Sequence, residues 1–450
     1  MKKYLFIIGI TATMFAACSG SEELVTQDVT DPVDEENITR EDLMGDIPIE
    51  FANVGGSASV ELTRGSANIG EVFQSGTMGI YCFAAKKINE VDAEDIKWSG
   101  NSTALGKILG LWLNNVKAHM SPIGNNEGIF VWENPEEKHY YPRKDWYAYK
   151  FVAYHPWTKY IALSASGIAA YVKIDGNDDV FAAIAEDPRV SVNATTDEKA
   201  YSHQYFDAIG IGNIEAGHKP YYNFKHLTSR LKFKVKLSSE CERELHVDSI
   251  CFSSFPNIIR VELAKVVNGN IVDNWYDTDF ITYYGEWMPA NLKNDLPKTT
   301  YQGEQVCVVN GDFWLREADD SSIGEKNANG EYKYVLNTAD YKDVGDCIMI
   351  PPVNKDHSKS TIGLKVYLAD KYGNKYTTLN PINVPAPEKD PNDPNDVGGW
   401  KAGMSYTIRV SMGGNIFFMD QTRGQITGKL DDFTPSGTID VTDEPVSNNP

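Results

Sequence analysis

The sequence predicts an all-β fold: two tandem β-sandwich domains behind a signal peptide and a flexible acidic tether. Short apolar or alternating segments recur from residue 47 onward, as in strands. Tyr, Phe and Trp, which favour strands, number 24, 18 and 9. The 450 residues, 42% of them hydrophobic, suffice for two globular cores. We expect a signal peptide at 1–17, a tether at 18–46, an N-terminal sandwich at 47–218 and a C-terminal sandwich at 219–450.

The first 17 residues have the build of a secretory signal peptide. Lys2 and Lys3 precede an apolar run of about a dozen residues that ends at small residues. A spanning helix needs roughly 20 apolar residues, so this run is too short to remain an anchor. The "FAAC" sequence resembles the lipobox of bacterial lipoproteins, which implies cleavage before Cys18 and diacylation of its thiol. The alternative is an ordinary signal peptide followed by a chance cysteine.

An acidic stretch follows Cys18. Residues 21–46 hold ten acidic residues and one base, Arg40, so they bury too little apolar surface to order themselves. Glu22 and Glu23 resemble the acidic export signal that sends some lipoproteins to the outer leaflet. The formal charge of −21 repels phosphate backbones, so we expect no nucleic-acid partner.

The N-terminal domain opens with an alternating segment, in which Ile47, Ile49 and Phe51 predict one strand and Val60 and Leu62 a second. Residues 76–86 form an apolar run of strand length. Residues 102–120 carry an apolar stripe at helical spacing, which predicts a helix.

The segment 139–157 is rich in aromatic residues. Its alternation favours a two-faced core strand. The other interpretation is a sugar-stacking platform made by Trp146, Tyr147 and Tyr149.

The C-terminal domain opens with the clearest amphipathic strand of the chain. Leu231, Phe233, Val235 and Leu237 alternate with three lysines. A second strand at 245–255 follows, which echoes the order of elements in the first domain. Four more strands are expected, at 304–311, 345–353, 360–370 and 404–412.

No catalytic or cofactor motif is present, so we expect no enzyme and no cofactor. The pairs Asp178–Asp179 and Asp319–Asp320 are interpreted as solvated turns, and His226 as the partner of a local backbone group. No cysteine spacing suits a metal, although Cys241 and Cys251 could bridge a hairpin. The Asp-rich loop 384–399 lacks the spacing of an EF-hand, which favours a solvated loop over a Ca²⁺ site.

Several short motifs together resemble the fimbrillins, the pilin-like lipoproteins that build type V pili on anaerobic Gram-negative bacteria. They occur in the family's order. The matching stretches are "FAAC", "ELTRGS", "HYYPRKDWYAYKFVAYHPW", "NFKHLTSRLKFKV" and "WKAGMSYTIRVSM".

The resemblance implies transthyretin-like sandwiches, a lipid anchor at Cys18 in the outer membrane, and a place in a surface pilus that serves adhesion. It also implies proteolysis between Arg64 and Gly65, after which a strand of another pilin subunit fills the emptied groove by β-augmentation. Host or bacterial surface glycans or proteins would be the adhesion partners.

The C-terminal tail departs from the family pattern. A donor strand is expected near 422–446, but Pro435 and Gly437 interrupt it and the closing Trp is missing. This favours a minor, tip or anchor subunit over a shaft subunit. The alternative function is a surface glycan-binding lipoprotein of a polysaccharide-uptake system.

Overall fold

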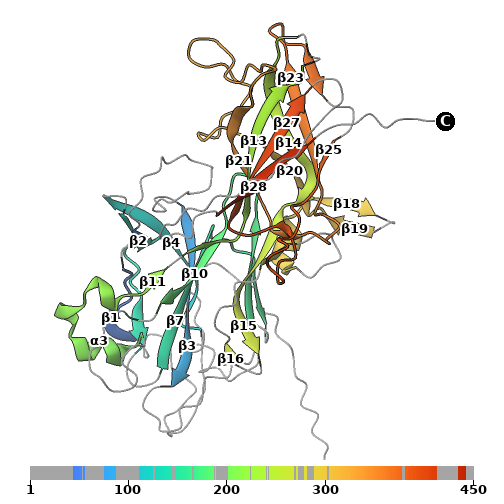
Figure 1. Cartoon of the computed structure of the whole chain (residues 1–450). Helices are drawn as coiled ribbons and strands as arrows, with labels where there is room; N and C mark the ends of the chain where they lie inside the picture. The colour runs from blue at the N-terminus through green and yellow to red at the C-terminus, as the bar shows by residue number, and fades with distance from the viewer. Residues whose placement is uncertain are drawn as a thin grey trace, which may run out of the picture.

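The computed structural model describes most of the chain between residues 44 and 441, and the structural statements below concern those residues (Figure 1). The described ranges are 44–52, 54–55, 76–87, 111–124, 127–142, 147–164, 167–186, 188, 201–222, 224–239, 241, 243–267, 270–271, 278–280, 288–301, 304–377, 381–412 and 434–441.

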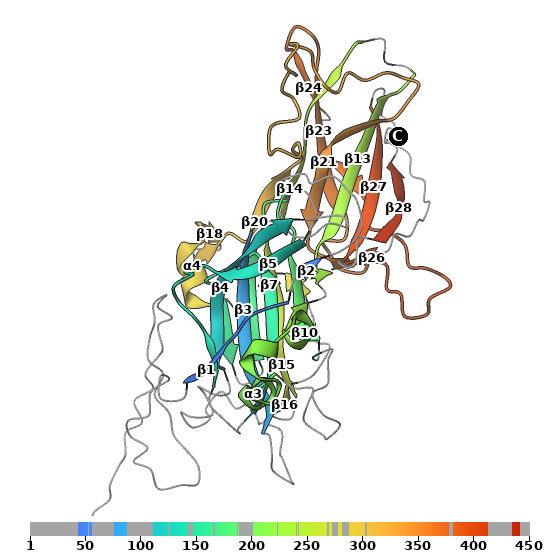
Figure 2. The ribbon, with the colours of Figure 1, turned by 90° about the vertical axis from the view of Figure 1, so that its left-hand side faces the viewer.

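The described chain is all-β, as predicted, and two units lie end to end in an elongated molecule (Figures 1 and 2). Among the residues that the structure describes, the helices are two short α-helices and two 3-10 turns: α3 His203–Ile209, α4 Ala290–Asp295, η2 Ile211–Asn213 and η3 Ala216–His218. None of the described helices is long and apolar enough to cross a membrane.

The N-terminal unit is built on an eight-stranded sheet. Its order is β11-β10-β7-β3-β4-β5-β2, with β12 also paired to β10. The bounds are β2 Val54–Gly55, β3 Thr77–Lys87, β4 Leu113–Gly124, β5 Glu127–Trp132, β7 Tyr147–His155, β10 Phe181–Glu186, β11 Tyr221–Tyr222 and β12 Lys225–His226.

A second sheet of this unit has the order β16-β15-β9-β8, with β17 also on β15. Two small sheets pair β1 with β6 and β18 with β19. The bounds are β1 Met44–Pro48, β6 Tyr140–Pro142, β8 Ile161–Ser164, β9 Gly167–Lys173, β15 Ile258–Val267, β16 Asn270–Ile271, β17 Thr278–Phe280, β18 Lys298–Tyr301 and β19 Glu304–Cys307.

The C-terminal unit is a sandwich of the sheets β21-β13-β27-β28 and β20-β14-β23-β24, with β25 also on β23 and a separate pair β22–β26. The bounds are β13 Ser229–Leu237, β14 His246–Pro256, β20 Asn310–Trp314, β21 Lys342–Ile350, β22 Val353–Asn354, β23 Ile362–Ala369, β24 Lys375–Thr377, β25 Ile382–Val384, β26 Gly399–Trp400, β27 Met404–Met412 and β28 Thr434–Val441.

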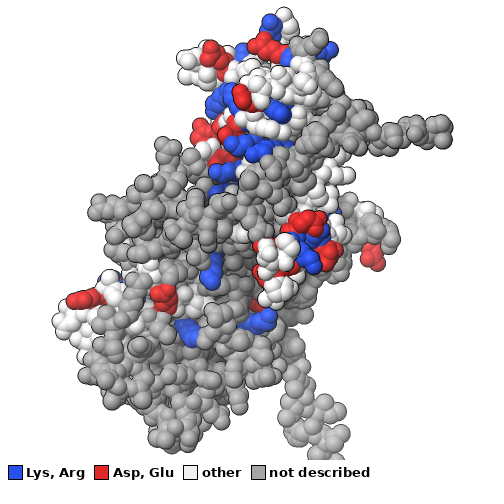
Figure 3. All heavy atoms as spheres, in the orientation of Figure 1, with Lys and Arg blue, Asp and Glu red and all other residues white. Residues whose placement is uncertain are grey.

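The amphipathic strand β13 is confirmed. Its four inward apolar residues are at most 2% exposed. On the other face Lys234 pairs with Asp343 and Lys236 lies over the ring of Tyr341. The view in Figure 3 shows Lys and Arg side chains next to Asp and Glu side chains over this unit. β13 and β14, consecutive in sequence, lie in different sheets of the sandwich.

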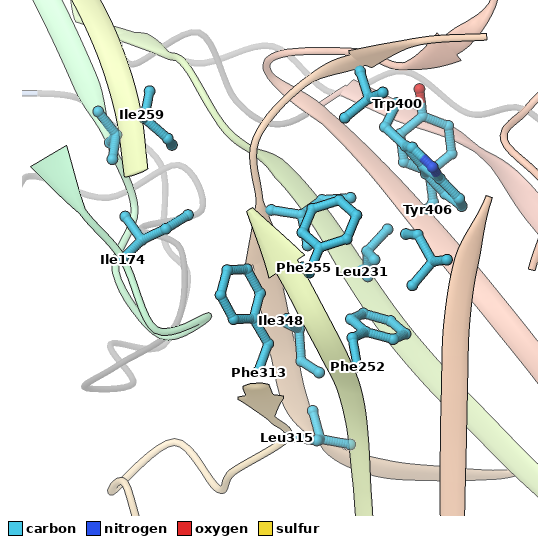
Figure 4. Close-up of a cluster of buried hydrophobic side chains, with 14 of the residues drawn as sticks. Ile174, Leu231, Phe252, Phe255, Ile259, Phe313, Leu315, Ile348, Trp400 and Tyr406 are labelled. Atoms are coloured by element: carbon cyan, nitrogen blue, oxygen red, sulfur yellow. The ribbon is translucent and has the colours of Figure 1, made fainter. Parts of the chain in front are cut away.

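The two units share one apolar core because a single segment runs through both. β14 lies in the C-terminal sandwich, and after Asn257 the chain continues as β15, which pairs with β9 of the N-terminal unit. Ile259 and Phe255 belong to one buried cluster that crosses between the units (Figure 4). Gly167 permits the pairing, because a Cβ there would lie 1.6 Å from the carbonyl oxygen of Ala264. β15 therefore adds residues to the first unit that the expected boundary at 218/219 leaves out.

The helix predicted at 102–120 is wrong over its described part, residues 111–120. The strand β4 begins at Leu113, and β3 and β5 pair with it on its two sides. Trp112 and Leu113 are both buried, but Asn115 has a positive φ of 54°, which breaks the helical path. The sheet on both sides overrides the local 3.6-residue pattern.

The aromatic segment 139–157 supplies a central strand. β7 lies between β3 and β10, and Phe151, Val152, Ala153 and Tyr154 are all fully buried. The core interpretation is confirmed. The alternative sugar platform is wrong at Tyr149, which is 4% exposed, while Trp146 and the side chain of Tyr147 lie outside the described residues.

Cys241 and Cys251 are both free, so the hairpin bridge is absent. In the Asp-rich loop the carboxylates accept hydrogen bonds from backbone N–H groups two residues on, for example Asp393 from Asn395. Asp396 is buried and pairs with Lys401 at 2.6 Å. Among the described residues no group of three or more His, Cys, Asp or Glu side chains is placed to hold a metal.

The interpretation of Asp178–Asp179 as a solvated turn is wrong for Asp179, whereas Asp178 is exposed. Asp179 is buried, and its carboxylate bonds to His226 Nδ1 at 2.6 Å and accepts from the Thr228 hydroxyl at 2.6 Å. The sequence predicted that His226 bonds to a local backbone group, but its Nδ1 bonds to this carboxylate instead. The network joins the start of β10 to the segment that leads from β12 into β13.

The neighbouring Asp178 gives a prediction about pH. Burial, followed by the carboxylates of Asp175, Asp179 and Asp320, raises the pKa of Asp178 to about 6. The folded state therefore binds this proton more tightly than the unfolded state, and the stabilisation is lost as pH rises through about 6. We expect Asp178→Asn to stabilise the chain at pH 7.5, by about 1 kcal/mol or less because the side chain is partly exposed.

The measurement is the melting temperature of wild type and Asp178→Asn at pH 7.5 and pH 4. The gain should vanish near pH 4, where the wild-type carboxyl is neutral in the folded state. The exposed Asp207→Asn serves as the control. A gain of equal size at both pH values would contradict the assignment.

Candidate functional site: the groove that holds the first strand

The first described residues, 44–52, lie as a narrow strip on the N-terminal unit. β1 pairs antiparallel with β6, and the helix α3 lies next to it (Figures 1 and 2). Beyond the strand, the Ile49 N–H donates to the His139 carbonyl at 2.7 Å and the Ala52 N–H to the Pro220 carbonyl at 2.9 Å. The strip is therefore held by backbone bonds to segments that follow it by roughly 90 to 170 residues.

Three side chains of the strip point into the core. Ile47, Ile49 and Phe51 are 1%, 2% and 3% exposed and belong to the aromatic-rich core of this unit. Their alternation matches the sequence prediction. Burial of an aliphatic or aromatic side chain contributes about 1.5–3 kcal/mol each, so the three contribute roughly 5–9 kcal/mol.

Phe51 occupies a pocket made of aromatic rings. Its ring centroid lies 5.7 Å from Phe130, 5.3 Å from Trp132, 6.0 Å from Phe151 and 5.7 Å from Tyr222. Three of the four contacts are edge-on, an arrangement that aromatic pairs prefer. The pocket is assembled from β5, β7 and β11, so it exists only in the folded unit.

The outward side chains of the strip carry charge. Asp46 bonds to His203 Nε2 at 2.8 Å and Glu50 to Lys219 Nζ at 2.6 Å. Both carboxylates are more than half exposed, so each pair contributes at most about 1 kcal/mol. The two pairs therefore help to set the register of the strip and add little to its stability.

Gly45 fixes the position of the strip along the groove. A Cβ at this residue would lie 2.5 Å from the Tyr141 carbonyl oxygen and 2.6 Å from the His203 ring. The carbonyl belongs to the backbone of β6 and cannot move aside. Only glycine fits at this point.

Tyr141 lies beside the strip in the floor of the groove. It is 1% exposed, and its ring lies 4.7 Å from Phe206 of α3. Burial raises the pKa of Tyr141 well above its usual value, so the phenol is neutral at every physiological pH. Tyr141 therefore brings a neutral ring and hydroxyl, but no charge, to the floor of the groove.

The predicted site residues Cys18, Arg64 and Gly65 lie outside the described residues, as do Val60 and Leu62. Sequence reasoning identified the buried face of the strip but missed its partners. Phe130, Trp132 and Tyr222 carry no local signal of a shared pocket. His203 and Lys219 are likewise far from residues 46 and 50 in sequence.

No protein-family model and no curated protein matches this sequence. Among solved structures, a provisionally assigned cell adhesion protein from Bacteroides ovatus is 10% identical with a TM-score of 0.37; the match covers 89% of this chain and 99% of that one. A fimbrial protein from Bacteroides vulgatus is 13% identical with a TM-score of 0.30, covering 75% and 89%. The tip fimbrial protein Mfa3 from Porphyromonas gingivalis is 7% identical with a TM-score of 0.29, covering 88% and 99%. All three TM-scores lie below 0.5.

Proposed function

We propose that this protein is a fimbrillin-like structural subunit of a surface pilus, assembled by strand exchange after proteolysis. The observation that carries the proposal is the buried strip 44–52, which lies N-terminal to the expected cleavage point between Arg64 and Gly65. Removal of the strip would expose the aromatic pocket of Phe51 and the free edge of β6. An incoming strand would restore both the backbone bonds and the buried side chains.

The C-terminal tail supports a minor, tip or anchor role over a shaft role. β28 pairs parallel with β27 of its own chain, with Ile439 opposite Ile408 and Val441 opposite Val410. A tail engaged within its own chain is not offered to a neighbour. The subunit would accept a strand more readily than it donates one.

A lipid on Cys18 would carry the precursor to the outer membrane. Cys18→Ala is expected to abolish fatty-acid incorporation, because no other cysteine lies in the junction between the signal and the acidic stretch. Metabolic labelling with a radioactive fatty acid measures this, and Cys241→Ala is the matched control. Undiminished label in Cys18→Ala would contradict the lipoprotein proposal.

Assembly is tested by blocking the cut. In its native cells, Arg64→Ala should leave the full-length precursor as a monomer, whereas the wild type should lose its N-terminal segment and enter high-mass surface polymers. Arg40→Ala is the control, since that arginine precedes the buried strip. Normal polymers containing uncut Arg64→Ala protein would contradict the proposal.

A further inference from the structure

The groove specifies the chemistry of the strand that replaces the strip. We propose that it accepts a strand with the pattern glycine, acid, aliphatic, any residue, aliphatic, acid, aromatic, and that this strand comes from a different subunit. The inference rests on the proposed function and names the partner's strand. Its template is the strip itself, Gly45 to Phe51.

Each element of the pattern follows from one contact. The glycine is required by the Tyr141 carbonyl, against which any Cβ would lie at 2.5 Å. The aliphatic positions are those of Ile47 and Ile49, both at most 2% exposed. The aromatic position is that of Phe51, which four aromatic rings surround, so a small replacement leaves a cavity and a charged one loses its hydration.

The two acidic positions follow from charge complementarity. His203 and Lys219 lie beside the strip and bond to the carboxylates of Asp46 and Glu50. An incoming strand with acids at these positions recovers both bonds. One with bases there would meet like charge at Lys219, so the pairs select against the wrong register and the wrong strand.

The chain's own tail fails this pattern at the position that matters most. Aligned on its glycine, the segment Gly437 to Asp443 places Ile439 and Val441 at the two aliphatic positions. The same alignment places Asp443 in the aromatic pocket. A carboxylate buried among four aromatic rings loses its hydration and is strongly disfavoured. Thr438 and Thr442 also replace both acids.

The register that places an aromatic residue in the pocket does not rescue the tail either. Phe433 is the only aromatic residue between Thr422 and Pro450. With Phe433 in the pocket, Lys429 and Asp431 would occupy the aliphatic positions. Both are charged, so the groove rejects the tail of a second copy of this chain.

The test uses the full mature chain, cut at an engineered protease site at residues 64–65, with competing peptides in excess. Native mass spectrometry then distinguishes the cleaved protein that keeps its original strip from the cleaved protein that carries an added peptide. The peptides are residues 44–52, the same peptide with Phe51→Ala, residues 436–446, and the tail peptide with Asp443→Phe. A fifth peptide, the third from the tail, adds Thr438→Asp and Thr442→Glu to the Asp443→Phe tail peptide.

We expect the 44–52 peptide to exchange into the groove and Phe51→Ala to weaken its binding at least 100-fold. The natural tail peptide should not bind measurably, and Asp443→Phe should confer binding that the two acids strengthen further. Binding of the natural tail within tenfold of the 44–52 peptide, or no gain from Asp443→Phe, would overturn the pattern and leave strand exchange standing. Failure of the 44–52 peptide itself would overturn strand exchange and the pattern together.

Discussion

Replacing Phe51 with alanine is expected to lower the free energy of unfolding of the uncut chain by about 3–5 kcal/mol. The substitution removes a ring that is 3% exposed and leaves a cavity lined by four other aromatic rings. Those rings belong to three strands of the sheet and cannot collapse together into the space. Denaturant unfolding followed by tryptophan fluorescence measures the loss, because Trp132 lies against Phe51.

Tyr372→Ala is the matched control, because that ring is 80% exposed and its removal should change stability by less than about 0.5 kcal/mol. If Phe51→Ala changes the free energy of unfolding no more than the control does, residues 44–52 do not complete the core and the groove has no role in assembly.

Asp179→Ala is expected to destabilise the chain by about 3–5 kcal/mol, since it removes the carboxylate that bonds to two buried polar side chains. The side chains of His226 and Asp179 are 0% and 5% exposed, and the Thr228 hydroxyl also loses its acceptor. Asp179→Asn keeps an oxygen acceptor of the same shape and should cost less than half as much. Urea unfolding of both variants separates the two effects. Equal losses would mean that packing, rather than the hydrogen-bonded network, accounts for the role of Asp179.

Local alternation predicted the strands well because it reports directly on burial. The inward residues of β13, and Ile47, Ile49 and Phe51 of the first strip, lie where a period of two places them. The same reasoning failed for residues 111–120, where an apolar stripe at helical spacing lies in the strand β4. Of the β4 side chains that the structure describes, only Leu113, Ala118 and Met120 are buried, while Asn114 is exposed, so the backbone pairing with β3 and β5 rather than the local pattern decides its conformation.

Long-range pairing could not be predicted from the sequence. β15 pairs with β9, which lies about 90 residues before it, and no local feature of either strand identifies its partner. The Asp179–His226 pair was hidden for the same reason, since an acidic doublet before a strand has the composition of a solvated turn. The candidate site was half predictable: the buried face of the strip follows from its alternation, whereas its aromatic pocket depends on the topology of three distant strands.

If residues 44–52 are a replaceable part of the fold, the segment that carries them should stay bound after cleavage until another strand displaces it. After cleavage at residues 64–65, size-exclusion chromatography measures how much of the N-terminal segment stays with the body, alone and with excess 44–52 peptide. We expect full co-elution without peptide, because roughly 5–9 kcal/mol of apolar burial holds the strip. When the peptide competes, we expect progressive loss of the original segment. Immediate loss of the segment from a body that stays folded, or retention despite prolonged competition, would contradict these expectations.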